Sequence, residues 1–344
     1  MAEPQAVGGL YETGIGVPDL DTATEYWGSF GFRAGPEASL DVAVAEGLYG
    51  HSSALTSRRL LHQDADHGLI RLMCWESPIN DGVGLKPLRG HISRWTGQFV
   101  RSAADVSNHA RVAETNGLPI NDLPPTFIDL STYNPGLFDG KAPRPFLDPV
   151  IGVSEYSLIQ PLSRQAFLER FNYESKMLGT YNDDCLFPAT QIAHIGLMFT
   201  SDDHGVYDFY DQTLGLKRVS DTPVPYERAT ASRDAYDLVE SDTYWAVNFE
   251  EPRSGAGMDE RRSGRLLMFR FESGSNLEDL SELARPGCLG HSLNTWRIRD
   301  LNAFHDECGA AGCTNLTSIR PDEFGVEAFT CKTPDEFIWT FIQA

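Results

Sequence analysis

Four segments of this 344-residue chain repeat one plan, and the repeat constrains the fold more than any other feature. Each segment reads as a short strand, a polar turn, a helical run, and then a glycine before several further strands. The four glycines stand 86, 98 and 97 residues apart. They are Gly31, Gly117, Gly215 and Gly312. Glycine suits the left-handed residue that ends a helix, so the repeat predicts four copies of one structural module.

The turns and strands around each helical run support this interpretation. An acidic residue precedes each run where a helix needs an N-cap acceptor. These residues are Asp19, Asp105, Asp202 or Asp203, and Asp300. Strand-like runs cover 69–75, 153–160, 244–250, 265–271 and 337–343. In the first copy we expect strands near 10–17 and 69–75 and a helix at 20–30, and further helices at 106–116 and 204–213. One copy is too short to cover a sheet alone, so two must combine.

The domain boundaries follow from the spacing of the copies. We expect an N-terminal pair over 1–160, a connecting helix or linker over 161–190 and a C-terminal pair over 191–344. Residues 118–149 form a Pro-rich insertion whose aromatic side chains predict an ordered lid over a pocket. Residues 163–182 carry apolar side chains at helical spacing.

Charge and composition limit the class of protein. The chain has 28 Lys+Arg and 49 Asp+Glu, and its formal net charge is -21. Such a surface repels phosphate backbones and anionic lipid, so we expect neither nucleic acid nor a membrane as partner. The N-terminus lacks the pattern of a signal peptide, and the cysteines show no CxxC spacing. These features predict a cytoplasmic protein with reduced thiols, and they leave a homodimer open.

Two runs carry a family resemblance. GIGVPDLDTATEYWGSFGF, from Gly14, and HIGLMFTSDDHGVYDFYDQTLGL, from His194, resemble the vicinal oxygen chelate superfamily. That superfamily includes glyoxalase I, extradiol ring-cleaving dioxygenases and bleomycin-binding proteins. The resemblance implies an α+β fold with four βαβββ modules in two curled mixed-sheet halves, which is a glyoxalase/dioxygenase-like architecture.

The resemblance also implies where site residues stand. Ligands in the superfamily come from the start of each module's first strand and from its last strand. The first-strand positions are Glu12, Thr96, His194 and His291, and the last-strand positions are Leu72, Glu155, Met268 and Thr340. The resemblance implies that His194 and His291 bind a divalent metal and that Glu12 and Glu155 are catalytic. Thr340 replaces the usual Glu, which puts a ring-cleaving dioxygenase in doubt.

Glu155 has the most specific signal among these residues. It stands seven residues after Asp148, whose Asp-Pro turn matches the superfamily's spacing. Side chains alternate along a strand, so Glu155 shares a face with Val153 and Ser157. A carboxylate on an apolar inner face would have a raised pKa unless a cation met it. We therefore expect Glu155 to bind a metal, pair with a cation or act as a general base.

The resemblance leaves several functions open. A metal-dependent enzyme is favoured, whose small-molecule substrate is an oxygenated organic compound, aromatic or not. A ring-cleaving dioxygenase is slightly ahead of a glyoxalase-type lyase or isomerase. The cofactor would be Fe(II) for a dioxygenase and Mn, Zn or Ni otherwise, because imidazole and carboxylate ligands suit these ions. The alternatives are a metal-free drug-sequestering protein, with no cofactor, and an interaction module.

Module pairing decides which candidates meet. Sequential pairing would bring His194 to His291 and Glu12 to Glu155. Nested pairing, first with fourth and second with third, would bring Glu12 to His291 and Glu155 to His194. The Pro-rich insertion and the expected linker helix favour sequential pairing slightly, but the sequence does not decide.

Overall fold

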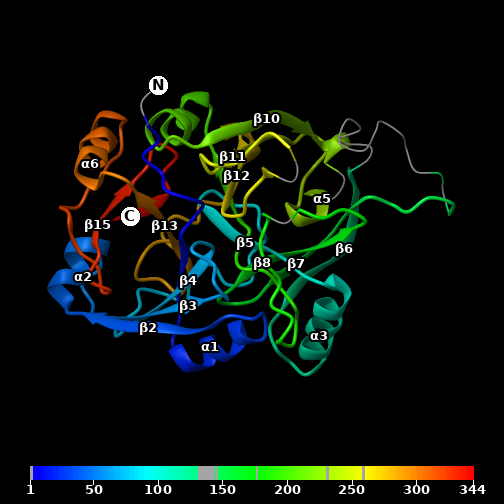
Figure 1. The fold of residues 1–344 in the computed structure, drawn as a ribbon, viewed down its shortest axis with the longest axis horizontal. Helices are drawn as coiled ribbons and strands as arrows, with labels where there is room; N and C mark the ends of the chain where they lie inside the picture. The colour runs from blue at the N-terminus through cyan, green and yellow to red at the C-terminus, as the bar shows by residue number, and fades with distance from the viewer. Residues whose placement is uncertain (1–2, 131–143, 145, 176, 230–231, 258–259) are drawn as a thin grey trace.

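Two eight-stranded mixed sheets stand side by side and form the two halves of the molecule (Figure 1). They come from a computed structural model that describes residues 3–130, 144, 146–175, 177–229, 232–257 and 260–344. The first sheet has the order β14-β15-β16-β13-β1-β4-β3-β2, and the second has the order β10-β11-β12-β9-β5-β8-β7-β6. The α+β architecture of four βαβββ modules in two curled halves is therefore confirmed.

The strands of the first sheet come from the two ends of the chain. They are β1 (Glu12–Gly16), β2 (Arg33–Leu40), β3 (Leu55–Leu61), β4 (Leu69–Trp75), β13 (Gly290–Ile298), β14 (Arg320–Pro321), β15 (Glu327–Lys332) and β16 (Ile338–Gln343). The second sheet takes the middle of the chain. Its strands are β5 (Ser93–Phe99), β6 (Asn121–Asp129), β7 (Gly152–Ile159), β8 (Arg164–Phe171), β9 (His194–Thr200), β10 (Lys217–Pro225), β11 (Thr243–Glu250) and β12 (Arg265–Phe271).

The modules pair in the nested way. Strand β1 runs antiparallel to β13, which joins the first module to the fourth. Strand β5 runs antiparallel to β9, which joins the second module to the third. The slight preference for sequential pairing was wrong, and each sheet crosses the expected boundaries at 160 and 191. In each sheet, the first strands of the two modules pair with each other at the centre. This pairing joins residues far apart in the sequence, so no local sequence pattern predicts it.

The expected linker helix was also wrong over its first half. Residues Arg164–Phe171 form strand β8, which closes the second module against β5 and β7. Phe167 lies in the main apolar core, while Leu168 lines a cavity on the other face of the sheet. Apolar residues four apart satisfy the period of two as well as the period of a helix, which explains the error.

Helices and helical turns connect the strands as the repeat predicts. They are α1 (Leu20–Gly28), α2 (Val42–Tyr49), α3 (Ala103–Thr115), α5 (Ser232–Ala235), α6 (Leu301–Ala310), and the short turns η2 (His204–Tyr207), η3 (Phe209–Thr213), η4 (Tyr226–Arg228) and η6 (Ser273–Ser275). The first, second and fourth modules have true α-helices. The third module has a 3₁₀ turn followed by a π turn where a helix over 204–213 was expected.

Side-chain caps fix where these helices begin. Asp19 accepts a hydrogen bond from the Thr22 N–H at 2.7 Å, and Asp300 accepts one from Ala303. Asp203 caps η2. The cap of α3 is Ser102, not Asp105 as expected, and Asp105 donates its own N–H to the serine hydroxyl. Both residue types serve as N-cap acceptors, so the position shifted by one turn.

An apolar core joins the two halves. Phe30 follows α1 and stacks on Phe167 of the second sheet at 5.1 Å. Phe209 of the third module lies 6.2 Å from Phe341 of the first sheet, measured between ring centroids. These aromatic side chains of the first and third modules therefore pack against the opposite half, and their burial stabilises the contact.

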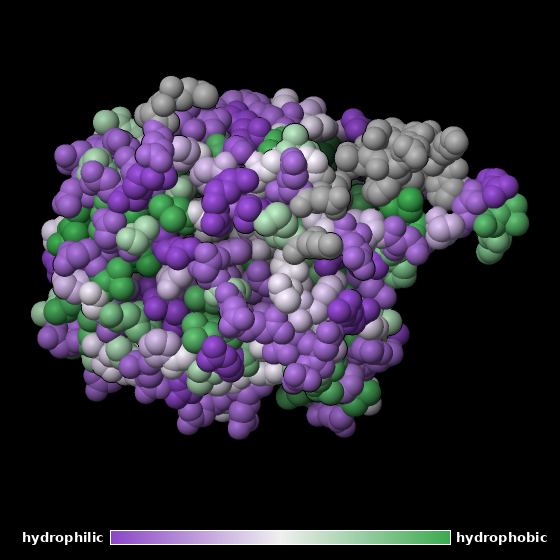
Figure 2. Space-filling view, viewed as in Figure 1, coloured by the Kyte–Doolittle hydropathy of each residue, from purple (hydrophilic) through white to green (hydrophobic). Residues whose placement is uncertain are grey.

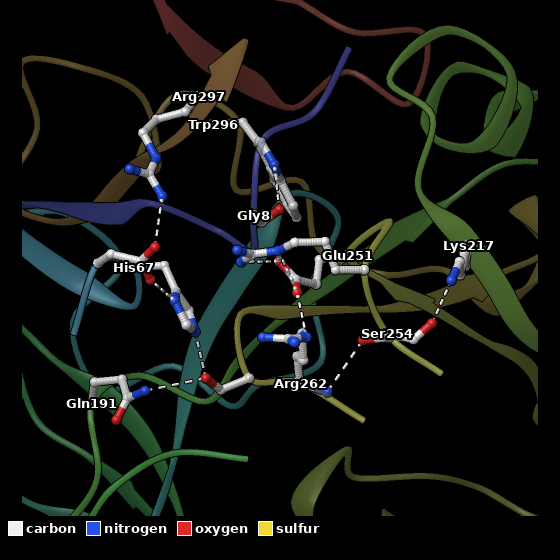
Figure 3. A network of polar contacts seen from close by, with 12 residues as sticks. Gly8, His67, Gln191, Lys217, Glu251, Ser254, Arg262, Trp296 and Arg297 are labelled. Carbon is white, nitrogen blue, oxygen red and sulfur yellow. Dashed lines mark hydrogen bonds and ion pairs between the residues drawn. The ribbon is translucent and has the colours of Figure 1, made fainter. Parts of the chain in front are cut away.

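A polar seam also crosses between the halves near the N-terminus (Figure 3). His67, just before β4, hydrogen-bonds Ser263, and Gln191 donates to the same hydroxyl at 3.1 Å. Glu251, at the end of β11, pairs with Arg262 at 3.2 Å. These contacts surround residues 8–10 and tie the chain's start to both sheets.

The Pro-rich segment is only partly described. Its start is the edge strand β6, where a register shift between Leu123 and Thr126 accommodates two prolines. Proline cannot donate a backbone hydrogen bond to a neighbouring strand, so within sheets it is confined to such bulges and edges. Residues 131–143 of the expected lid lie outside the described residues. The face shown in Figure 2 is mostly hydrophilic, as the net charge predicts, and no described helix is long and apolar enough to cross a membrane.

Candidate functional site

The inner face of the second sheet carries a cavity of about 400 Å³. Strands β5, β7, β9 and β12 form its floor, and the segment around η4 and α5 covers it. Most lining side chains are apolar or aromatic, including Trp95, Phe99, Leu168, Leu267 and Phe269. This volume lies within the range of small-molecule sites in proteins.

Glu155 stands on the wall of this cavity. It lies on β7 between Thr126 of β6 and Leu168 of β8. Val153 lines the same cavity, so the two share a face as the alternation predicts. Burial raises the pKa of the Glu155 carboxyl to about 7. Among the described residues, no Lys, Arg or His forms an ion pair with Glu155 that would lower this pKa. Both the protonated and the ionised carboxyl are therefore populated near neutral pH.

His194 lies at the floor of the same cavity. It begins β9, opposite Gly97 of β5 and beside Arg265 of β12. Its imidazole packs edge-on against Trp95 at 5.5 Å. Burial and, to a smaller extent, the charge of Arg265 lower the pKa of His194 to about 3. The ring is therefore neutral at physiological pH.

Two glycines make room for this arrangement. A Cβ on Gly97 would lie 2.2 Å from Nε2 of His194, and a Cβ on Gly196 would lie 1.9 Å from the Trp95 ring. Each ring therefore crosses over the neighbouring strand at a position that only glycine leaves free. The pair of glycines in GQF and IGL is the sequence signal that could have located the cavity floor.

Arginines stand around the cavity, and the sequence pattern did not single them out. Arg265 pairs with Glu250 at 3.2 Å, and Arg261 lies 3.6 Å from the same carboxylate. Arg228, at the end of η4, lines the cavity and is solvent-exposed. It forms no ion pair with any described residue. Arg228 is thus a cation that could meet an anionic group of a bound molecule.

The equivalent face of the first sheet is closed by a buried ionic cluster. Glu12 is completely buried and accepts hydrogen bonds from Arg59 and Arg71, each from Nε at 2.6 Å. Arg71 also lies 3.3 Å from Asp322 and 3.2 Å from Glu323. Burial alone would raise the pKa of Glu12, but the two arginines together lower it.

Helix α2 completes this closure. Its residues Ala45, Leu48 and Tyr49 pack on the sheet with Leu293 and Met73. The Tyr49 hydroxyl donates to Glu323 at 2.8 Å. We call the inner faces of the first and second sheets the first and second cups. Side chains of the protein fill the first cup, and Glu12, expected as a catalytic residue, is held by two arginines inside it.

His291, expected as a metal ligand, lies away from both cups. It is the second residue of β13 and lines a small cavity with Arg94 and Arg164. Nε2 of His291 accepts a hydrogen bond from the Arg164 N–H at 3.2 Å. Burial and the charges of the two arginines lower the pKa of His291 to about 3. Two cations beside the ring repel a further cation, so this place does not suit a metal ion.

The last-strand positions differ from expectation by one residue in two modules. Leu72 and Met268 lie in the main apolar core. Their neighbours Arg71 and Leu267 face the cups instead. A slip of one residue reverses the face of a strand. Thr340 is buried and hydrogen-bonds Thr330 at 3.0 Å.

Thr96 points away from the cavity that Trp95 lines. Its hydroxyl donates to the carbonyl oxygen of Arg164 at 3.4 Å. Thr96 is therefore a buried residue of the sheet's other face.

The donor set of the open cavity does not fit the facial triad. His194 and Glu155 lie in the second sheet, whereas His291 is in the first. Within the ranges that the structure describes, the only three His, Cys, Asp or Glu side chains close enough to share a metal ion are Cys308, Cys313 and Cys331. These cysteines belong to α6, the turn after it and β15, far along the first sheet. The open cavity therefore offers two donors, one imidazole and one carboxyl.

Comparison with known proteins supports the fold. No family model matches the chain, and no curated protein matches its sequence. Among solved structures, a protein from Bacillus subtilis assigned provisionally as a dioxygenase is 14% identical over 99% of this chain and 86% of its own, with a TM-score of 0.52. Glyoxalase I from Zea mays is 14% identical over 97% of this chain and 92% of its own, with a TM-score of 0.50. The chain has the vicinal oxygen chelate fold.

Proposed function

We propose that the cavity of the second sheet binds a small, largely apolar organic molecule and that Glu155 transfers a proton to or from it. The observation that carries this proposal is a carboxyl with a raised pKa on the wall of a ligand-sized apolar cavity. A general base works best when its pKa lies near the operating pH. The reaction class would be that of an isomerase or lyase that removes a proton next to a carbonyl.

Three polar groups around the cavity have a part in the proposed reaction. Glu155 takes the proton, because its carboxylate form is populated at neutral pH and no described Lys, Arg or His pairs with it. Neutral His194 can donate a hydrogen bond to a substrate oxygen at the floor. Arg228 can stabilise negative charge as it develops on the molecule. The aromatic lining excludes water and favours an aromatic or branched substrate.

The residues of the cavity favour this reaction over ring cleavage. A ring-cleaving dioxygenase needs two imidazoles and a carboxylate at one iron. Among the described residues, His194 and Glu155 line the same cavity, whereas His291 does not. We therefore place proton transfer ahead of the dioxygenase. If a divalent ion does bind at His194 and Glu155, it would supply Lewis acidity to a substrate oxygen.

A second candidate is sequestration without chemistry. The apolar lining and the absence of a second carboxylate on the described cavity wall suit a binding protein. The same cavity would then hold its molecule, and Glu155 would contribute only a hydrogen bond.

One experiment separates the two candidates. Phenylacetone, a small aryl ketone with acidic C–H groups, is incubated in D₂O with the protein, and deuterium incorporation is followed by proton NMR. Proton transfer by Glu155 predicts catalysed exchange that Glu155→Gln reduces by roughly 10²–10⁴-fold. Glu114→Gln, an exposed carboxylate on α3, serves as the matched control.

Binding is measured separately with 4-nitrocatechol, whose absorbance reports its ionisation. Binding without exchange favours sequestration. Neither binding of 4-nitrocatechol nor exchange of phenylacetone in a folded protein would count against the cavity as a site for small aromatic molecules.

A further inference from the structure

Two buried arginines and a buried histidine meet at the contact between the two sheets. Arg94 lies on β5, Arg164 begins β8 and His291 is the second residue of β13. They line a cavity of about 10 Å³ together with Val83, Gly84, Pro161, Leu162 and Gly290. The side chains of Arg94 and Arg164 belong to residues that are each 3% exposed. This cavity is separate from the open cavity around His194.

The arginines bond only to neutral oxygen atoms. Arg94 donates to the carbonyl oxygen of Ala284 at 2.6 Å and to that of Ile338 at 3.4 Å. Arg164 donates to the carbonyl oxygen of Pro87 and, at 3.2 Å, to the hydroxyl of Ser93. In the described part of the chain no carboxylate lies within ion-pair distance of either guanidinium.

Four buried N–H donor positions of these three side chains have no hydrogen-bond partner among the residues that the structure describes. They are Nε of Arg94, Nε and Nη1 of Arg164, and Nδ1 of His291. The histidine tautomer follows from its other nitrogen, because Nε2 accepts a hydrogen bond from the Arg164 N–H. A neutral imidazole that accepts at Nε2 carries its proton on Nδ1. All four groups are therefore donors.

The positive charges of Arg94 and Arg164 also favour an electron-rich partner at this point. Burial lowers the pKa of Arg94 to about 10 and that of Arg164 to about 9, so both remain cations at neutral pH. Asp335 acts on Arg94 through its charge, but its carboxylate is bonded to Tyr210 and Thr333. Two buried cations without a bonded anion are costly, and the four free donors would add to this cost.

We propose that Arg94, Arg164 and His291 hold one small anion of the chloride class between the two sheets. The cavity has room for one water-sized particle, which excludes phosphate, sulfate and organic acids. A single-atom anion can accept several N–H donors at once and offset two positive charges. Because β5 and β8 belong to the second sheet and β13 to the first, the anion joins the two halves of the molecule.

The direct test uses the wild-type protein with bromide as the probe. Crystals grown in sodium bromide are measured at the bromine absorption edge. An anomalous peak between Arg94, Arg164 and His291 is expected. In solution, the melting temperature in sodium chloride should exceed that in sodium gluconate at equal ionic strength. The rise should be about 2–5 °C for each tenfold increase in chloride above its dissociation constant.

Variants locate the effect. Arg164→Met should abolish the difference between chloride and gluconate, whereas Arg33→Met, at an exposed arginine, should preserve it. No bromide peak together with equal melting temperatures in the two salts would overturn the proposal and assign a water to the cavity. A full chloride effect in folded Arg164→Met would also overturn it. The wild-type measurements decide the question if Arg164→Met does not fold.

Discussion

Replacing Glu12 by Gln tests whether the first cup is a closed structural element or an active site. Glu12 is fully buried and is the only described carboxylate that pairs with Arg59. Glu12→Gln keeps the size of the side chain and removes the charge. Arg59 then remains buried without an anion, while Arg71 keeps Asp322 and Glu323.

The expected loss follows from the burial of this pair. Removing one partner of a buried ion pair costs about 3–5 kcal/mol, because the remaining charge is left uncompensated. The glutamine oxygen still accepts one hydrogen bond, so we expect the lower end, about 3 kcal/mol. At roughly 2–4 °C per kcal/mol for a chain somewhat smaller than this one, the melting temperature should fall by about 6–12 °C.

Thermal and urea unfolding followed by circular dichroism measure this loss. The matched control is Glu37→Gln, because Glu37 pairs with Arg58 at the surface of the same half. An exposed pair contributes about 0–1 kcal/mol, so the control should melt within about 4 °C of wild type. Ligand binding in the second sheet should be unchanged in Glu12→Gln below its melting temperature. A variant that is as stable as the control but has lost binding or activity would refute this interpretation of the first cup.

Three further predictions concern pH, space and metal. The pKa of Glu155 is raised in the folded chain, so the folded state binds the carboxyl proton more tightly than the unfolded state does. The folded state should therefore lose stability as pH rises from about 4.5 to about 7. Melting temperatures at pH 5 and pH 8 should show this loss in the wild type and not in Glu155→Gln. Gly97→Ala should displace the His194 ring, destabilise the protein by about 1–3 kcal/mol and weaken 4-nitrocatechol binding. A variant that matches the wild type in stability and in binding would contradict the position of the ring over β5. Elemental analysis should find the same iron content in the wild type and in His291→Ala. If a folded His291→Ala variant lost stoichiometric iron, His291 would be an iron ligand and the facial triad would be supported.

Local chemistry explains which parts of the fold the sequence could predict. The caps at Asp19 and Asp300 and the glycines after the helices are satisfied by neighbours a few residues away, and these features placed the modules correctly. Module pairing depends on β1 meeting β13 more than 270 residues later. Either pairing would bury the same apolar faces, so no periodicity distinguishes them.

The candidate site shows the same division. The alternation along β7 placed Glu155 on the inner face, and the start of β9 placed His194 there as well. His291 was misplaced because its environment comes from Arg94 and Arg164, residues of another module. Arginine is usually exposed, so no feature of the sequence predicts two buried guanidiniums beside a histidine. The ionic cluster around Glu12 escaped prediction for the same reason.

The nested arrangement has a consequence for synthesis of the chain on the ribosome. The second sheet uses residues 93–271 and can be completed while the fourth module is still being made. The first module emerges earliest, yet its strand β1 must wait for β13 with an unpaired edge. Such an edge invites wrong pairing or association with other chains. The open edge of the first module therefore stays exposed until the fourth module, which shields it, has been synthesised.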